Sequence, residues 1–130
     1  VQTCALPILD LDVVGNYVVL GGTTESLDYP TTAGSFSQVF LGGVTDVVLS
    51  VLNLELTNLQ ASTYFGDNLN YDKFGALYTD GSHVYVVGWT PDADFPVTSG
   101  VFQESKGGDG TYEGFISKFN IGTLVQKATS

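Results

Sequence analysis

Short apolar runs alternate with polar turn residues along the whole chain, and this pattern predicts strands. β-Branched and aromatic residues fill the runs, and clusters of Gly, Asn, Asp and Ser bound them, as is typical of β-structure. Two runs, DVVLSVL and VYVVGW, are nearly continuous rather than alternating, which indicates sheets covered on both faces. No helix is expected. The pattern predicts strands over residues 9–14, 17–22, 46–52, 59–65, 74–79, 83–89, 114–119 and 124–129.

The second half of the chain repeats the pattern of the first half. DYPTTAGSF at 28–36 matches DFPVTSGVF at 94–102 with an offset of 66 residues, and an inserted residue then raises the offset to 67, where Ser50 matches Ser117. A period of tens of residues is the signature of stacked structural units. We therefore expect an all-β fold of two four-stranded antiparallel sheets.

The repeated motif lies in a long connection between the second and third strand of each unit, and we expect it to anchor that connection. A loop of about 24 residues in a compact domain is either functional or held internally. Asp turns the backbone, Pro extends the residue before it, and Gly permits a reversal. We expect the two aromatic residues of each copy to pack together under the loop. The motif residues are Asp28, Tyr29, Pro30, Gly34 and Phe36, and then Asp94, Phe95, Pro96, Gly100 and Phe102.

Several strings recur in the same order and carry a family resemblance. They are GNYVVLGGT, DYPTTAGSF, DVVLSVLN and STYFGD, followed by GSHVYVVGWT, DFPVTSGVFQ and EGFISKFN. This order resembles the SBBP-type bacterial β-propeller repeat, although Glu113-Gly114 and Phe65-Gly66-Asp67 depart from its usual Asp-Ala and Gly-Gly pairs. The resemblance implies two blades of a larger β-propeller, one from residues 9–66 and one from residues 67–130.

The resemblance also implies a function class. It suggests an exported or cell-surface bacterial protein, further propeller repeats of the parent chain as partners, and no catalytic residues in the repeat itself. We therefore expect a non-catalytic scaffold that binds a protein or another ligand, not an enzyme. The alternative is a carbohydrate-binding module that serves a secreted polysaccharide-degrading enzyme.

Isolated blades are expected to self-associate. Two blades alone leave sheet faces and strand edges uncovered, and repeat arrays generally need about three units. The last residues, LVQKATS, stop where the first unit continues as LQASTYFGD, which suggests that the chain is a fragment.

The net charge of the chain narrows its possible binding partners further. Fourteen acidic residues stand against four lysines, for a net charge of −10, so the field around the protein repels nucleic acid. No apolar run reaches the roughly 18 residues that cross a bilayer, so we expect no membrane insertion.

The first eight residues look foreign to the rest of the chain. VQTCALPI contains the single cysteine, Cys4, and has no counterpart in the second unit. One back-translation of it matches the end of a common sequencing-library adaptor. We therefore interpret residues 1–8 as a non-native artefact and exclude them from the fold.

Residues that break the repeat are the first candidates for binding. When the two units are aligned, Trp89 corresponds to Thr23 and Asp92 corresponds to Ser26. Trp89 fits either a sugar-stacking platform or a buried core position. We carry Trp89 and Asp92 forward as candidate ligand-binding residues.

Calcium is the only cofactor that the composition leaves open, because one cysteine and one histidine cannot form a zinc site. GDNLNYDK offers Asp67, Asn68, Asn70 and Asp72 as oxygen ligands, although the spacing fails the calcium-loop pattern and lacks its bidentate Glu. No other cofactor is expected.

Two resemblances to catalytic motifs are rejected. Ser82 and His83 are adjacent in a strand, so their side chains point to opposite faces and cannot act as nucleophile and base. SKGGDG at 105–110 lacks both the residue order of a phosphate-binding loop and a following helix.

Overall fold

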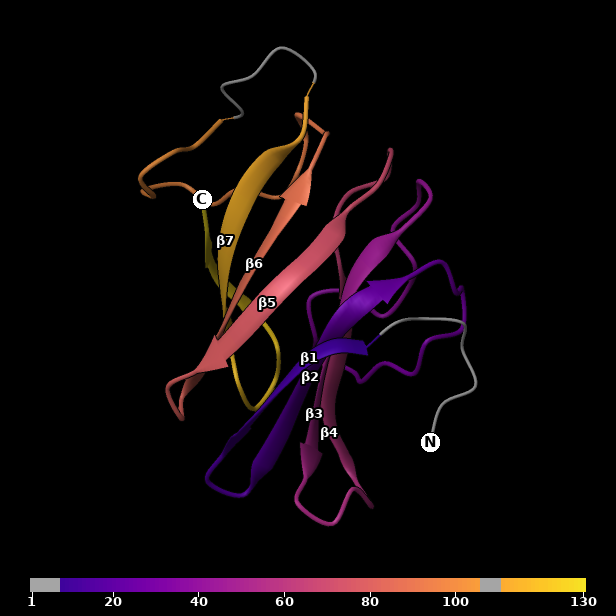
Figure 1. The fold of residues 1–130 in the computed structure, drawn as a ribbon, viewed down its shortest axis with the longest axis vertical. Coiled ribbons are helices and arrows are strands. Elements are labelled where there is room, and N and C mark those ends of the chain that lie inside the picture. Colours follow the sequence, from indigo (N-terminus) through magenta and orange to yellow (C-terminus); the bar gives the residue numbers. More distant parts are fainter. Residues whose placement is uncertain (1–7, 106–110) are drawn as a thin grey trace.

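The computed structural model describes residues 8–105 and 111–130, which form two four-stranded antiparallel sheets (Figure 1). Strand order within each sheet follows the chain, so each strand pairs with its sequence neighbour. This confirms the all-β class and the two antiparallel sheets. The first sheet contains β1 (Ile8–Val14), β2 (Tyr17–Thr24), β3 (Asp46–Asn53) and β4 (Leu59–Phe65). The second contains β5 (Lys73–Thr79), β6 (His83–Thr90), β7 (Glu113–Asn120) and β8 (Gln126–Thr129).

Strand boundaries lie within two residues of those predicted, and the two-residue differences are at the end of β2 and at the start of β8. Leu124 was expected to begin this strand, but its φ of 54° is left-handed and its N–H bonds to the carbonyl of Asn120 at 2.8 Å. It therefore closes the turn, and the strand starts at Gln126. At the other end β1 includes Ile8, which pairs with Gly22, although the sequence grouped it with the foreign segment. Residues 1–7, with Cys4, and residues 106–110 of the glycine-rich stretch lie outside the described residues.

Residues related by the sequence offset occupy matching positions in the two sheets. In the first sheet Ser50 pairs with Ser62, and their hydroxyls lie 2.7 Å apart. In the second sheet Ser117 pairs with Thr129, and these hydroxyls lie 2.9 Å apart. The two sheets are therefore comparable residue by residue.

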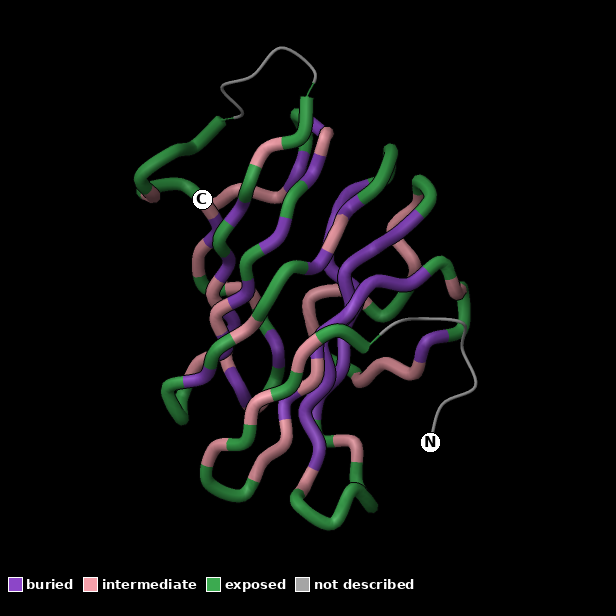
Figure 2. Tube along the Cα trace, in the orientation of Figure 1, coloured by how far each residue is buried: buried purple, intermediate pink, exposed green. Residues whose placement is uncertain are grey.

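The two sheets stack through unlike faces. We call the face covered by the sheet's own β2–β3 or β6–β7 connection the loop-side face, and the opposite one the far face. The far face of the first sheet, with Val19 and Val51, packs on the loop-side face of the second sheet, with Val84 and Phe119. All four side chains are fully buried in one apolar core between the sheets. Figure 2 colours the buried stretches of the strands of both sheets purple.

Phe65, the last residue of β4, sits at the centre of an aromatic cluster in this core. Its ring meets four others edge-on, from its own sheet's connection and from the second sheet. The centroid distances are 5.0 Å to Phe36, 5.0 Å to Phe95, 5.9 Å to Phe115 and 4.9 Å to Phe119.

The repeated motif holds its connection against the outer edge of the last strand of each sheet. Thr32 donates its N–H to the carbonyl of Ser62 at 3.0 Å, and its hydroxyl accepts the N–H of Ser62 at 2.8 Å. Thr98 makes the same two contacts with Thr129, at 3.2 and 3.0 Å. The loop thus satisfies backbone groups that an edge strand otherwise exposes.

The aromatic residues of the motif do not pack as predicted. Phe36 was expected beside Tyr29, yet the loop crosses the edge of β4 between them. Tyr29 packs on the loop-side face against Tyr64 at 6.0 Å, whereas Phe36 reaches the core on the other side of that edge.

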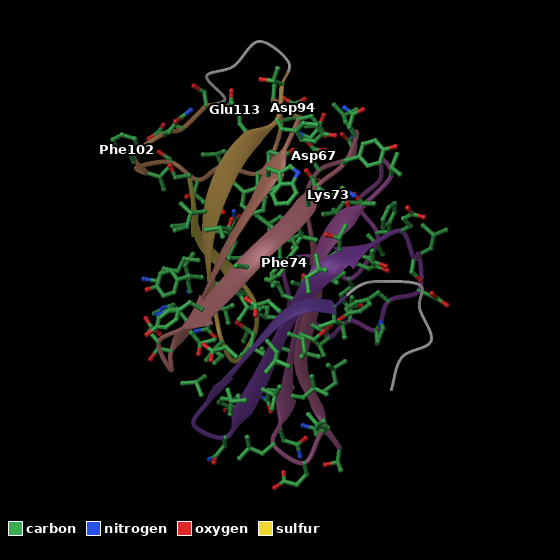
Figure 3. The ribbon with its side chains drawn as sticks, in the orientation of Figure 1. Asp67, Lys73, Phe74, Asp94, Phe102 and Glu113 are labelled. Carbon is green, nitrogen blue, oxygen red and sulfur yellow. The ribbon has the colours of Figure 1, made fainter. Side chains whose placement is uncertain are left out.

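Phe102 was expected beside Phe95, but it is fully exposed, with a relative exposure of 101% (Figure 3). Ser130 matches Thr63, so the position that matches Phe65, the partner of Phe36, lies past the last residue of the sequence. Phe95 instead stacks on Phe115 at 4.4 Å.

The edge strand β5 of the second sheet is also hydrogen-bonded, by side chains of the first sheet. Asp10 on β1 accepts the N–H of Leu77 at 3.0 Å, and Asp12 accepts the N–H of Thr79 at 3.1 Å. These carboxylates tie β1 to β5 across the gap between the sheets and cover N–H groups that face away from β6.

Candidate functional site

Four buried aspartates meet where the chain passes from the first sheet to the second. Asp46 begins β3, Asp67 and Asp72 lie in the connection from β4 to β5, and Asp92 follows β6. Figure 3 marks the position of Asp67 at this junction. The group therefore belongs to neither sheet alone.

The connection is held in place by backbone bonds to the loop before β3. Val44 donates its N–H to the carbonyl of Asn70 at 2.7 Å, and Asp72 donates to the carbonyl of Thr45 at 3.0 Å. Gly43 allows this approach, since its φ is 65° and a Cβ there would collide with the carbonyl of Leu69. The glycine and the backbone pairing together bring Asp72 beside Asp46.

The carboxylates are close to one another. One oxygen each from Asp67, Asp72 and Asp92 lies within 4.8 Å of the others. Asp92 is oriented by Asn70, whose N–H and side-chain amide donate to its two oxygens at 2.9 and 2.6 Å. Hence the three carboxylates converge from two segments.

Three of the carboxylates have one bonded oxygen and one bare oxygen. Leu41 donates to Oδ2 of Asp46 at 2.6 Å, Leu69 donates to Oδ1 of Asp67 at 2.9 Å, and the N–H of Asp67 donates to Oδ2 of Asp72 at 2.8 Å. Oδ1 of Asp46, Oδ2 of Asp67 and Oδ1 of Asp72 are buried and accept no hydrogen bond from the described residues.

Burial shifts the titration of these groups. Loss of solvent, together with the charges of Asp72 and Asp67, raises the pKa of Asp46 to about 7 against the opposing effect of the N–H of Leu41. Burial likewise raises the pKa of Asp67 to about 6 and raises that of Asp72. The site therefore disfavours four uncompensated negative charges.

The predicted calcium ligands are partly brought together. Asp67 and Asp72 both enter the cluster, but Asn68 is exposed and Asn70 acts as a donor to Asp92. Asp46 was missed, although its match in the second sheet, Glu113, is also acidic, and an acid at this position in both halves was the available signal.

Trp89 and Asp92, the two candidate ligand-binding residues, lie in different parts of the structure. Asp92 is buried in the acidic cluster, whereas Trp89 is 43% exposed on the far face of the second sheet. Trp89 lines a cavity of about 360 Å³ together with Thr23, Glu25, Thr45 and Lys73.

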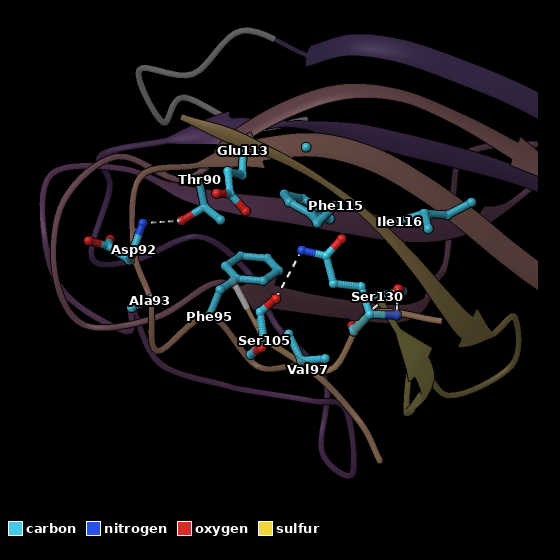
Figure 4. Close-up of a pocket in the computed structure, with 12 residues that line it drawn as sticks. Thr90, Asp92, Ala93, Phe95, Val97, Ser105, Glu113, Phe115, Ile116 and Ser130 are labelled. Atoms are coloured by element: carbon cyan, nitrogen blue, oxygen red, sulfur yellow. Dashed lines mark hydrogen bonds between the residues drawn. The ribbon is translucent and has the colours of Figure 1, made fainter. Parts of the chain in front are cut away.

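A second cavity, of about 300 Å³, lies beside Phe95 and Phe115 (Figure 4). In the first sheet the matching space holds Tyr64, whose hydroxyl accepts the N–H of Tyr29 at 2.9 Å and donates to the carbonyl of Ser26. The second cavity therefore corresponds to the space that Tyr64 fills in the first sheet.

Ser82 lies in the β5–β6 turn and His83 begins β6, and both are held by Asp80. Its carboxylate accepts the backbone N–H groups of Ser82 and His83 at 2.9 and 2.7 Å, and these bonds lower the pKa of Asp80 to about 2. Nδ1 of His83 lies 3.7 Å from the same carboxylate. The described contacts are those of a capped turn.

The chain matches no protein-family model and no curated protein sequence. Within residues 8–105 and 111–130 there is no helix long and apolar enough to cross a membrane.

Proposed function

We propose that the chain is a non-catalytic scaffold of stacked β-sheets, part of a larger β-propeller in an exported or cell-surface bacterial protein. Its sheets stack head to tail, and further sheets of the same kind are its partners. Loops at the rim of such a stack present binding surfaces for protein or other ligands.

One observation carries the proposal. The contact between the sheets joins a far face to a loop-side face, so one face of each kind is left open at the two ends. The open far face of the second sheet exposes Val87, Trp89 and Ile116, and Ile116 is 51% exposed. These positions match Gly21, Thr23 and Leu49, which face the second sheet in the contact already formed.

The loop-side face of the first sheet, which no other sheet covers, is apolar as well. Leu11 is 57% exposed and Val18 and Leu20 are half-buried, whereas Val84 and Val86, the matches of the latter two, are fully buried. The open faces are thus complementary by the same pairing that holds the two sheets together. A stack built on contacts between unlike faces can add sheets indefinitely, unless the rotation from sheet to sheet closes the stack into a ring.

Sedimentation velocity on the full chain over a range of concentrations tests this proposal. We expect concentration-dependent association, because a second copy can place its loop-side face on the open far face. Ile116→Lys should reduce the association, whereas Leu54→Lys, which charges an exposed leucine in the β3–β4 turn, should not. A chain that stays monomeric at every concentration would contradict the proposal.

Carbohydrate binding is the second candidate, and the half-exposed Trp89 favours it, because it lines a cavity that combines apolar side chains with those of Thr23, Glu25 and Lys73. An indole face next to hydroxyl, carboxylate and ammonium groups suits a sugar ring. A glycan array with the wild-type chain and Trp89→Ala separates the two functions. Loss of glycan binding with unchanged association supports this alternative; loss of association alone supports the stacking role.

A further inference from the structure

We propose that Asp46, Asp67, Asp72 and Asp92 form a calcium site that ties the connection between the two sheets to both of them. The inference does not rest on the scaffold function, because all four carboxylates belong to one chain. It replaces the ligand set suggested by the local sequence with one drawn from three separate segments.

The spacing of the oxygens suits one ion. Oxygens bound to a single Ca²⁺ at 2.3–2.6 Å are at most about 5 Å apart. One oxygen each from Asp67, Asp72 and Asp92 meets this limit, since all lie within 4.8 Å of one another. Asp46 borders the same space, because a side chain on Gly66 would collide with Oδ2 of Asp72 and lie 3.2 Å from Oδ1 of Asp46.

The bare oxygens give the second, independent argument. Asp46 is fully buried and Asp72 is 2% exposed, yet each has a buried oxygen without a hydrogen bond from the described residues, and so does Asp67. A buried carboxylate oxygen without a partner is costly. The opposite oxygen of each group is fixed by a backbone N–H, so the bare oxygens are held in place to receive a cation.

No side-chain cation takes this role among the described residues. The ammonium of Lys73 lies over the ring of Tyr71, 5.3 Å from its centroid, and the ion pair that the described part of the chain contains joins His83 to Asp80 in the β5–β6 turn. The negative charge of the cluster is therefore left for a diffusible cation.

The chemistry of the donors selects calcium. All are oxygens, which hard divalent cations prefer over the softer zinc and copper. Mg²⁺ keeps several waters in a rigid octahedron, whereas Ca²⁺ accepts an irregular shell of six to eight oxygens. A buried set of four carboxylates, three of them on loops and one at the start of β3, fits the larger ion better.

Calorimetric titration of the EDTA-treated full chain with CaCl₂ at pH 7.5 tests the proposal. We expect binding of one ion per chain and a rise in Tm of roughly 5–10 °C when calcium is about 100 times its Kd. Magnesium at equal ionic strength should bind at least about tenfold more weakly. Absence of binding heat together with an unchanged Tm, or tighter binding of magnesium, would overturn the calcium site.

Two variants locate the site. Asp72→Asn and Asp67→Asn should each weaken calcium binding at least about tenfold. Asp94→Asn makes the same charge change at an exposed aspartate two residues after Asp92 and should leave the Kd unchanged. Circular dichroism in EDTA checks that the variants fold. If a variant does not fold, the titration of the wild-type chain still tests the proposal. Equal Kd values for all three variants would place any bound ion elsewhere.

Discussion

The ring of Phe65, at the end of the first sheet, meets the ring of Phe95 from the second sheet's loop edge-on, with centroids 5.0 Å apart and planes at 83°. Phe65 is fully buried, so this contact joins the two sheets through their shared core rather than at its rim. The stability of the pair of sheets should therefore depend strongly on this one side chain.

Phe65→Ala should lower the free energy of unfolding by about 3–5 kcal/mol, because it removes a ring from the centre of an aromatic cluster and leaves a cavity. Phe102→Ala is the matched control, since Phe102 is fully exposed, and it should change stability by less than about 0.5 kcal/mol. Urea denaturation followed by circular dichroism measures both. Equal effects of the two substitutions would contradict the aromatic contact between sheets.

The hydroxyl of Thr98 should contribute to stability through the edge of β8. Thr98→Val removes the acceptor of the Thr129 N–H while keeping the side-chain shape, so a loss of about 1 kcal/mol is expected. Thr98→Ser keeps the hydroxyl and should lose less, and Ser99→Ala, on an exposed neighbour in the same loop, should lose little. A Val variant as stable as the wild type would show that the loop does not cap this edge.

Between pH 5 and 8 the ion-free protein should become less stable as the pH rises. Burial raises the folded pKa of Asp46 from 3.8 to about 7, so its stabilising contribution is complete below pH 3.8 and is lost as the pH passes through 7. Asp67 and Asp72 shift in the same direction. Differential scanning fluorimetry in EDTA at constant ionic strength should record a falling Tm.

Asp46→Asn removes one of these buried charges and should flatten that pH dependence, whereas the exposed Asp94→Asn should not. A Tm in EDTA that stays constant or rises from pH 5 to 8 would contradict the electrostatics described for the cluster.

The cavity beside Phe95 and Phe115 should accept an added segment. Extending the chain after Ser130 by Tyr-Phe-Gly-Asp, the residues that follow Thr63 in the first sheet, should raise the free energy of unfolding by roughly 2–4 kcal/mol as two aromatic rings become buried. A Ser-Ser-Gly-Asp extension controls for length and should add little.

The same extension should change the role of Phe102. In the parent chain Phe102→Ala is expected to be neutral, but in the extended chain the added Phe supplies the partner that Phe36 finds in Phe65. Phe102→Ala should then become destabilising, by about 1 kcal/mol or more. Additive effects of the extension and the substitution would refute the match between the two loops.

Strand positions could be predicted because each strand is marked locally, by apolar runs and by turn residues at their ends. The sequence offset also predicted which residues of the two sheets correspond, since Ser50 and Ser117 occupy matching positions in β3 and β7. Which face each aromatic residue joins was not predictable from the motif. Phe36 and Tyr29 are separated by the edge of β4, and that depends on the hydrogen bonds of Thr32.

The acidic cluster was predictable only in part, because its members come from separate segments. Asp67 and Asp72 are close in sequence, but Asp46 and Asp92 join them through the backbone pairing of Thr45 with the connection and through Asn70. Long-range pairing of this kind leaves no local signal in the sequence. The only hint in the sequence was that position 46 and its match, Glu113, are both acidic.

The head-to-tail contact of the two sheets is tested most directly by nuclear Overhauser effects from the Phe65 ring in a chain with labelled phenylalanines. The structure predicts cross-peaks from Phe65 to Phe95, Phe115 and Phe119, whose ring centroids lie 5.0, 5.9 and 4.9 Å away. Cross-peaks from Phe65 to Phe36 and its own sheet alone would contradict the stacking of the two sheets.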